Sequence, residues 1–322
     1  MNIGTNIKKR RFELGMSQQD LADALGYKTR STIAKIESGE NDVSHKKLQR
    51  FAEVLDTTVE ALVTGTASAQ PLILKETPAA EDAFTGQTGR SRTVVVILAG
   101  GKSVRNQQNI PNQFINILGK PVIVYCLEAY ESHPSVDDIY IVCLRGWDQI
   151  ATAYAEQYKI TKLRGLIPAA SSGLLSVKNA LDFVATKYND NDIVIFQEAT
   201  RPMVTADMIS KLLGTCYEKG HAHICQLKKD FIHFTYDSGK ADYIDRNTVV
   251  ELQSPEAYRL SVIKDIFEKA QRQHDPLTET CCAMLMYHYG YEINFIEGSS
   301  NNIKLIRQED IAVVTALMNR RE

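Results

Sequence analysis

The chain has 322 residues, of which 44% are hydrophobic and 24% charged, and its formal net charge at pH 7 is -2. This composition is that of an ordinary globular protein, and the length allows more than one domain. The small net charge excludes a general attraction to nucleic acid, so any DNA binding must come from a local basic patch. No run of residues has the length of a membrane span, and the N-terminus lacks the apolar core of a signal peptide. Because the six cysteines form no C-x-x-C pair, we expect a cytoplasmic protein with reduced thiols and no membrane partner.

The first 65 residues predict a bundle of five short helices. Ser17 and Asp20 resemble a capping box at the start of the second helix. Ile33 and Ile36 are spaced so that both can face a core, which leaves the polar side chains of the third helix outward. The predicted helices span residues 3–14, 17–25, 31–37, 44–55 and 58–63.

Two stretches of this bundle carry a resemblance. Ser17-Gln-Gln-Asp-Leu-Ala-Asp-Ala-Leu-Gly26 is followed by Ser31-Thr-Ile-Ala-Lys-Ile-Glu-Ser-Gly39, and together they resemble the lambda-repressor/Cro-type helix-turn-helix family over residues 3–64. In such domains the third helix enters the major groove of DNA, and two copies read two half-sites, which implies a homodimer. The resemblance implies base contacts near the third helix and a phosphate contact in the second; these residues are Thr29, Arg30, Ser31, Thr32 and Lys35, and Gln18.

Charge agrees with this interpretation, because residues 1–50 hold ten Lys and Arg against six Asp and Glu. The alternative is a helical bundle that has kept the fold and lost DNA, or that binds protein. Residues 66–92 then change character: Thr, Ala, Ser, Pro, Gly and Gln dominate without a periodic pattern, which predicts a flexible linker.

From residue 93 to residue 322, apolar strands alternate with amphipathic helices. Such alternation predicts a doubly wound, mostly parallel sheet, in which ligands lie beyond the carboxyl ends of the strands. The polar segment 228–254 interrupts the alternation and predicts an arm that projects from the sheet. The predicted strands span residues 93–98, 138–143, 162–165, 192–197, 222–227 and 292–297, and the predicted helices 122–132, 147–158, 173–188, 206–219, 260–274, 278–289 and 307–319.

The first strand of this region ends at a glycine loop with two cations. Small residues at Ala99-Gly100-Gly101 let backbone approach a ligand, and Lys102 and Arg105 follow. A glycine turn after a first strand commonly holds a polyphosphate. The loop is neither a Walker A motif nor G-x-G-x-x-G. Its alternative interpretation is a plain strand-to-helix turn with solvated charges.

Five segments together resemble the cytidylyltransferases that act on 2-C-methylerythritol 4-phosphate and ribitol 5-phosphate. The resemblance covers essentially all of residues 93–322 and implies an α/β Rossmann-like nucleotidyltransferase domain with a mostly parallel sheet and a projecting β-arm, after an all-α helix-turn-helix domain. The segments are residues 98–105 with Pro111-Asn-Gln-Phe114 and 118–121, residues 175–181, Gln197-Glu-Ala-Thr-Arg-Pro202, residues 243–246 with Gln253-Ser-Pro-Glu256, and residues 298–304 with 309–310.

The resemblance implies that a sugar-alcohol phosphate attacks the α-phosphate of CTP, with Mg²⁺ as cofactor and pyrophosphate as leaving group. Such chemistry needs cations and backbone donors more than a general base. Glu198 is the candidate magnesium ligand, although it could instead cap the next helix. By resemblance the catalytic residues are Arg105, Lys304 and Lys102; the nucleotide-binding residues are Ala99, Gly100, Gly101, Ser176 and Glu198; and the substrate-binding residues are Arg201, Arg246, Ser254 and Thr278.

Some positions depart from the family pattern. Asn112 stands where the family has a lysine, Phe231 where the arm has a threonine, and Glu256 where glutamine is usual. Two hypotheses follow. In the first, the protein is a cytidylyltransferase with its own DNA-binding domain; in the second, it is a transcription regulator whose enzyme-derived domain senses CTP or a CDP-alcohol without efficient turnover.

Overall fold

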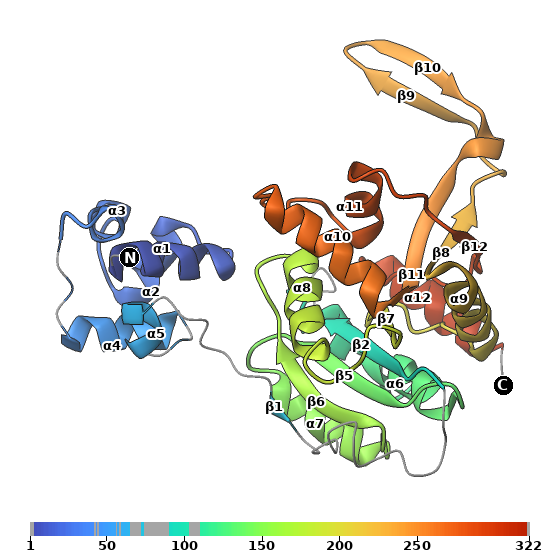
Figure 1. The fold of residues 1–322 in the computed structure, drawn as a ribbon, viewed down its shortest axis with the longest axis horizontal. Coiled ribbons are helices and arrows are strands. Elements are labelled where there is room, and N and C mark those ends of the chain that lie inside the picture. The colour runs from blue at the N-terminus through green and yellow to red at the C-terminus, as the bar shows by residue number, and fades with distance from the viewer. Residues whose placement is uncertain are drawn as a thin grey trace.

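The computed structural model describes residues 3–41, 43, 45–55, 57, 59–64, 72–73, 90–102 and 110–320. Its N-terminal part is all-helical (Figure 1), which confirms the five predicted helices with ends that differ by one or two residues. These helices are α1 Ile3–Glu13, α2 Gln18–Leu25, α3 Arg30–Ser38, α4 His45–Val54 and α5 Val59–Thr64.

Local sequence explains where these helices begin and end. The predicted capping box is present, because the Asp20 amide donates to Ser17 Oγ at 3.1 Å and the Ser17 amide donates to Asp20 Oδ2 at 2.8 Å. Gly26 and Gly39 close α2 and α3 with φ of 76° and 81°, a conformation that glycine adopts without steric cost. The apolar faces meet in one core, whose fully buried members include Ile7, Leu21, Ile33, Phe51 and Leu55.

The second part of the chain is built on an eight-stranded sheet with strand order β1-β6-β5-β2-β7-β11-β8-β12. The four strands β6, β5, β2 and β7 are parallel to one another, while β11 runs antiparallel to both of its neighbours. The strands are β1 Leu72–Ile73, β2 Thr93–Ala99, β5 Asp138–Cys143, β6 Leu163–Pro168, β7 Ile193–Glu198, β8 His221–Leu227, β11 Val250–Arg259 and β12 Phe295–Glu297.

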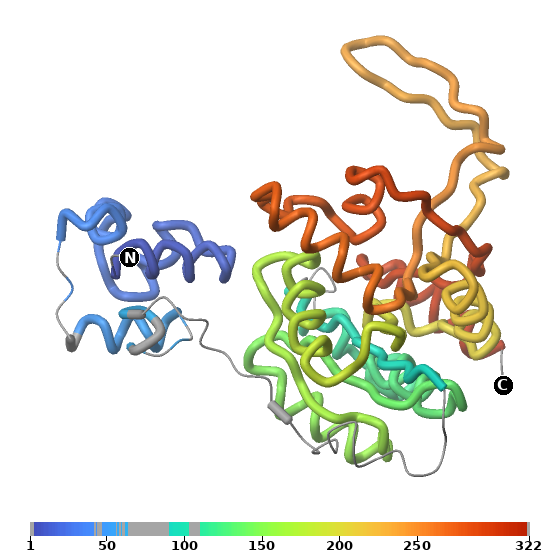
Figure 2. The backbone as a smooth tube through the Cα atoms, viewed as in Figure 1, coloured from blue at the N-terminus to red at the C-terminus, as the bar shows by residue number. Residues whose placement is uncertain are grey.

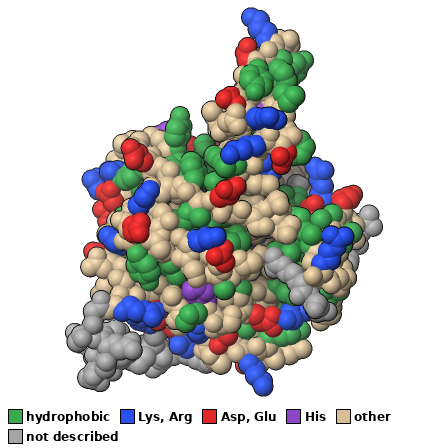
Figure 3. Space-filling model, turned by 90° about the vertical axis from the view of Figure 1, so that its right-hand side faces the viewer, with side chains coloured by type: hydrophobic (Ala, Val, Ile, Leu, Met, Phe, Trp, Pro, Cys, Tyr) green, Lys and Arg blue, Asp and Glu red, His purple; other side chains and the backbone are tan. Residues whose placement is uncertain are grey.

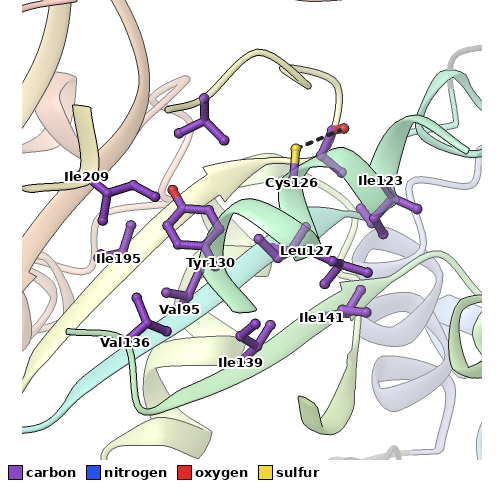
Figure 4. Close-up of a cluster of buried hydrophobic side chains, with 14 of the residues drawn as sticks. Val95, Ile123, Cys126, Leu127, Tyr130, Val136, Ile139, Ile141, Ile195 and Ile209 are labelled. Atoms are coloured by element: carbon purple, nitrogen blue, oxygen red, sulfur yellow. Dashed lines mark hydrogen bonds between the residues drawn. The ribbon is translucent and has the colours of Figure 1, made fainter. Parts of the chain in front are cut away.

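Helices cover both faces of this sheet, and its central strands are accordingly buried along nearly their whole length. On one face α6 (Val122–Ser132), α7 (Asp148–Gln157) and α9 (Ala206–Lys219) pack on side chains such as Val95 and Ile97. Figure 4 shows Cys126, Leu127 and Tyr130 of α6 seated over the strands of that face. On the other face lie α8 (Gly173–Val184), α10 (Leu260–Arg272) and α11 (Cys282–His288), and α12 (Gln308–Met318) packs in a smaller cluster.

Several elements differ from the sequence prediction: β1 and β11 were not predicted, and the helix predicted over residues 278–289 begins only at Cys282, as α11. The arm was expected to run to residue 254, but the projecting hairpin consists of β9 (His233–Asp237) and β10 (Lys240–Ile244), and the chain re-enters the sheet as β11 at Val250. Figure 2 traces this excursion out from β8 and back into β11. The prediction missed β11 because Pro255 removes a ladder hydrogen bond, and the sheet absorbs it at a register shift between Leu252 and Glu256.

The linker region is described at two residues. Leu72 and Ile73 form β1, which pairs with Gly165 and Leu166 of β6 at the edge of the sheet. Residues 66–71 and 74–89 of the predicted linker lie outside the described residues. Within the described part of the chain, no helix has both the length and the apolar character that crossing a bilayer requires.

Candidate functional site

The glycine loop lies beyond the carboxyl end of β2, as predicted. A Cβ on Gly100 would lie 2.5 Å from Ala169 Cβ, so the loop packs too closely on residues 169–172 to accept a larger residue. Ser176 orders that second segment, because its Oγ accepts from the Ala170 amide at 2.9 Å and donates to the Ser172 carbonyl at 2.8 Å. Ala99, Gly100 and Ser176 are therefore brought together, and Gly101 and Lys102, which follow Gly100, are exposed.

A short helix, η1 (Asn112–Phe114), contributes two buried side-chain amides, and one of them binds this loop. Gln113 Nε2 donates to the carbonyls of Ala99 and Gly101, both at 2.8 Å. Asn112 Nδ2 donates to the carbonyls of Leu305 and Ile306 at 3.1 and 3.2 Å. Asn112, which stands where a lysine is expected from the family resemblance, therefore binds a backbone carbonyl 193 residues away in sequence.

Glu198 ends β7, the strand beside β2, and two predicted cations meet on it. Lys304 Nζ donates to one carboxylate oxygen, and Arg201 Nε donates to the other at 2.8 Å. Arg201 also donates from Nη1 to the Asn302 carbonyl at 2.7 Å, and its side chain is only 9% exposed. Lys304, at 39% side-chain exposure, is the member of the group that is most open to solvent.

The two cations change the pKa of the Glu198 carboxyl. Burial alone would raise the pKa of the Glu198 carboxyl, but the positive charges of Lys304 and Arg201 outweigh burial and hold the pKa below its ordinary value. Glu198 therefore stays ionised at neutral pH and offsets the repulsion between the two cations. The two cations therefore converge on one partly buried carboxylate at the carboxyl end of β7.

Buried polar side chains surround this group of charges. Ser254 Oγ accepts from the Glu198 amide at 3.1 Å, and Asn302 Nδ2 donates to Gln253 Oε1 and to the Ser254 carbonyl at 3.1 and 2.8 Å. Sequence reasoning included Ser254 but missed Gln113, Gln253 and Asn302 as site-building residues. All three stand in the quoted motifs, and that position was the signal that could have found them.

Of three further predicted residues, two are exposed and one is outside the described part of the chain. Arg105 falls in residues 103–109, outside the described residues. Arg246 is exposed in η2 (Arg246–Thr248) at the base of the arm, and Thr278 is exposed in the loop that joins α10 to α11. Their roles stay predictions.

The magnesium role of Glu198 also stays a prediction. Both of its oxygens accept from Lys304 and Arg201, which leaves little affinity for a divalent cation in this arrangement. Among the described residues, no group of three His, Cys, Asp or Glu side chains is placed to hold a metal ion. The residues present therefore do not fit a magnesium ion held by protein ligands alone.

The predicted DNA-contacting residues gather at the start of α3. Thr29, Arg30, Ser31 and Lys35 are exposed, Thr32 is half-buried, and the hydroxyls of Thr29 and Ser31 lie 2.7 Å apart. Gln18 of α2 is held differently from the rest, because its Nε2 donates to Glu37 Oε2 at 2.9 Å.

Glu37 belongs to a buried ion pair that fixes the helices behind this surface. Arg11 Nε and Nη2 donate to its two oxygens at 2.5 and 2.9 Å, and the two side chains are 4% and 2% exposed. A bidentate pair of this kind holds α1 against α3, behind the exposed residues at the start of α3.

Comparison with known proteins agrees with this arrangement. Residues 93–320 match the family model described as 2-C-methyl-D-erythritol 4-phosphate cytidylyltransferase, and residues 7–62 match the model described as helix-turn-helix. A ribitol-5-phosphate cytidylyltransferase of Lacticaseibacillus paracasei is 31% identical over 70% of this chain and 98% of its own length. A 2-C-methyl-D-erythritol 4-phosphate cytidylyltransferase of Clostridium botulinum is 28% identical over 71% of this chain and 99% of its own.

Solved structures share the fold. The 4-diphosphocytidyl-2C-methyl-D-erythritol synthase of Anaerococcus prevotii has a TM-score of 0.63 at 19% identity and covers 71% of this chain and 97% of its own. The family matches define a nucleotidyltransferase domain that follows a helix-turn-helix domain. The chain belongs to the 2-C-methyl-D-erythritol 4-phosphate cytidylyltransferase family.

The depressed pKa of Glu198 makes a prediction about stability against pH. The ion pairs contribute stability that is fully present above the unfolded-state pKa of about 4.3 and is lost as pH falls through the lower folded-state pKa. We expect Glu198→Gln to lower the free energy of unfolding by roughly 1–2 kcal/mol at pH 7, and this difference to shrink as pH falls through the lowered folded-state pKa of Glu198. Urea unfolding across pH checks this, with Asp182→Asn, whose carboxylate is 61% exposed, as the control. A difference that is independent of pH would contradict it.

Proposed function

We propose that the C-terminal domain transfers CMP from CTP to a sugar-alcohol phosphate and releases pyrophosphate. The observation that carries this proposal is the convergence of Lys304 and Arg201 on one carboxylate at the end of β7. Two cations in a crevice beside a glycine loop suit a reaction between two phosphates, because repulsion between them is the main obstacle.

The chemistry follows from the charges. The acceptor phosphate is already an anion at neutral pH, so one of its oxygens can attack the α-phosphorus of CTP without a general base. The bond to the β-phosphate oxygen breaks, and pyrophosphate carries away the electron pair. In this proposal Lys304, Lys102 and Arg105 neutralise the charge that builds on the α-phosphate, while the amides of Gly100 and Gly101 hold phosphate oxygens.

Acceptor binding is assigned to Arg201, Ser254 and Thr278, with Glu198 freed from its cations to meet the sugar hydroxyls. Magnesium would arrive on the phosphate oxygens of CTP, since Mg²⁺ is commonly held by few carboxylates and by substrate phosphates. The acceptor is 2-C-methylerythritol 4-phosphate or ribitol 5-phosphate, the two compounds that the relatives' names contain.

The second candidate function is a regulator that binds CTP or a CDP-alcohol without efficient turnover. Asn112 favours it, because the family's lysine is lost there, and Phe231 favours it because it cannot donate a hydrogen bond to an acceptor phosphate. Under both proposals the N-terminal domain binds duplex DNA in the cytoplasm. Under both, the protein is a homodimer, with Arg246 of one copy near the acceptor site of the other.

The transfer is tested with purified protein, CTP, Mg²⁺ and a panel of polyol phosphates, following pyrophosphate. We expect Lys304→Gln to lower kcat/KM by about 10²-fold to 10³-fold, because it removes one cation from the transition state. Lys211→Gln, which alters a lysine that is 60% exposed on α9, is the control. If the wild type binds CTP saturably but releases no pyrophosphate with any acceptor, the regulator hypothesis replaces the enzyme hypothesis.

DNA binding is tested with duplexes selected from a randomised pool. We expect Arg30→Ala to weaken binding about 10-fold or more at moderate salt, because the exposed guanidinium at the start of α3 is the strongest base-reading group there. Affinity of the wild type should fall steeply with salt. Arg272→Ala removes the same charge from α10 and should leave binding unchanged. Equal affinities of the wild type and Arg30→Ala would contradict the assignment.

The arm offers a surface for the homodimer. Phe234, Tyr236 and Tyr243 lie on one face of the hairpin, and they are 59%, 78% and 60% exposed. Figure 3 shows hydrophobic side chains gathered on this projection. A two-stranded hairpin with so much exposed apolar surface suits a partner.

We expect Tyr236→Ser to weaken self-association at least 10-fold in sedimentation experiments. The matched control is Tyr287→Ser on α11, where the side chain is 72% exposed. A wild type that sediments as a monomer would contradict the dimer, and a Tyr236→Ser variant that sediments like the wild type would exclude the arm from its interface.

A further inference from the structure

Two adjacent side-chain amides connect two segments of the crevice that are far apart in sequence. Gln113 binds the carbonyls of the glycine loop at Ala99 and Gly101, and Asn112 binds the carbonyls of Leu305 and Ile306. Both side chains are buried, at 2% and 4% exposure. The short helix η1 therefore acts as a bracket between the loop that would hold nucleotide phosphates and the segment that carries Lys304.

The segment after Lys304 is held from several sides. The Leu305 amide donates to the Thr200 carbonyl at 2.9 Å, and the Ile306 amide donates to Asp310 Oδ2 at 2.9 Å. The backbone amides of Leu305 and Ile306 thus have hydrogen-bond acceptors, and their carbonyls accept from the Asn112 side chain. A side-chain amide nitrogen has two hydrogens, and here each has a backbone oxygen within hydrogen-bonding distance.

We propose that Asn112 is a positioning residue for Lys304, and this inference rests on the proposed cytidylyl transfer. By fixing the backbone at residues 305 and 306, Asn112 aims the lysine that directly precedes them into the crevice. The amide at position 112 thus contributes geometry to the site, whereas a lysine there would contribute charge. Catalysis then depends more on Lys304, because position 112 supplies no cation.

A double-mutant cycle tests this dependence. We expect Asn112→Ala to lower kcat about 10-fold with little change in KM for CTP, and to have almost no further effect in the Lys304→Gln background. Thermal melts identify any loss of folded protein. Asn116→Ala, an exposed asparagine of the same segment in β3 (Asn116–Ile117), is the matched control and should behave as the wild type.

Several outcomes would overturn the inference while leaving the transfer reaction intact. If the effects of Asn112→Ala and Lys304→Gln on kcat simply multiply, Asn112 does not act through Lys304. If Asn112→Lys turns over faster than the wild type, the position is a phosphate contact and the bracket is dispensable. A slower Asn112→Lys variant supports the inference.

Hydrogen exchange gives a readout that needs no turnover. We expect Asn112→Ala to raise amide exchange in residues 303–307 at least several-fold, and Asn116→Ala to leave it unchanged. Unchanged exchange in Asn112→Ala overturns the inference even in an inactive protein. A wild type without pyrophosphate release refutes the proposed transfer, and raised exchange then still supports Asn112 as the residue that orders the Lys304 segment.

Discussion

Lys304 and Arg201 carry like charges, and the crevice can hold both only because Glu198 lies between them. Each cation donates to one oxygen of that carboxylate, and the attraction outweighs the cost of burial, as the lowered pKa of Glu198 shows. A phosphate group offers the same acceptor geometry with more charge. The cation group is therefore built around an internal anion, and in the proposed transfer a phosphate group takes the place of that anion.

The cations keep their places because neutral amides hold the backbone around them. Gln113, Gln253 and Asn302 are each less than a tenth exposed, and they bind backbone carbonyls 14, 46 and 48 residues away in sequence, respectively. Amides suit this work, because they satisfy buried carbonyls without adding charge to a site that already carries several ionised groups. Asn112 likewise donates hydrogen bonds to the backbone carbonyls of the two residues that follow Lys304.

Both domains contain partly or fully buried ion pairs, but the pairs have different roles. In the N-terminal domain, the buried pair Arg11–Glu37 holds the helices together and leaves the exposed start of α3 free for recognition. In the C-terminal domain, the paired charges form the crevice itself. The arm carries aromatic side chains that no described part of the sheet covers, which is why we assign it to contacts between copies.

Much of this protein could be predicted from its sequence. Strict apolar runs predicted β2, β5 and β7, and the capping box and glycines predicted α2 and α3, because such signals act within a few residues. The motif segments also identified Glu198, Arg201 and Lys304. The strand β11 escaped prediction because Pro255 looks like a strand breaker until a bulge accommodates it.

The sequence by itself determined the local elements, the two cores and the residues that carry charge. Only the tertiary structure decided which of them meet: Glu198 binds a lysine 106 residues away, and Asn112 binds carbonyls 193 and 194 residues away. The physical reason is that a side chain's partner depends on how strands and helices pack, and residue type alone does not specify that packing. From the sequence alone, Asn112 in place of a lysine is only the loss of a positive charge. In the folded chain, its side chain binds the backbone that follows Lys304.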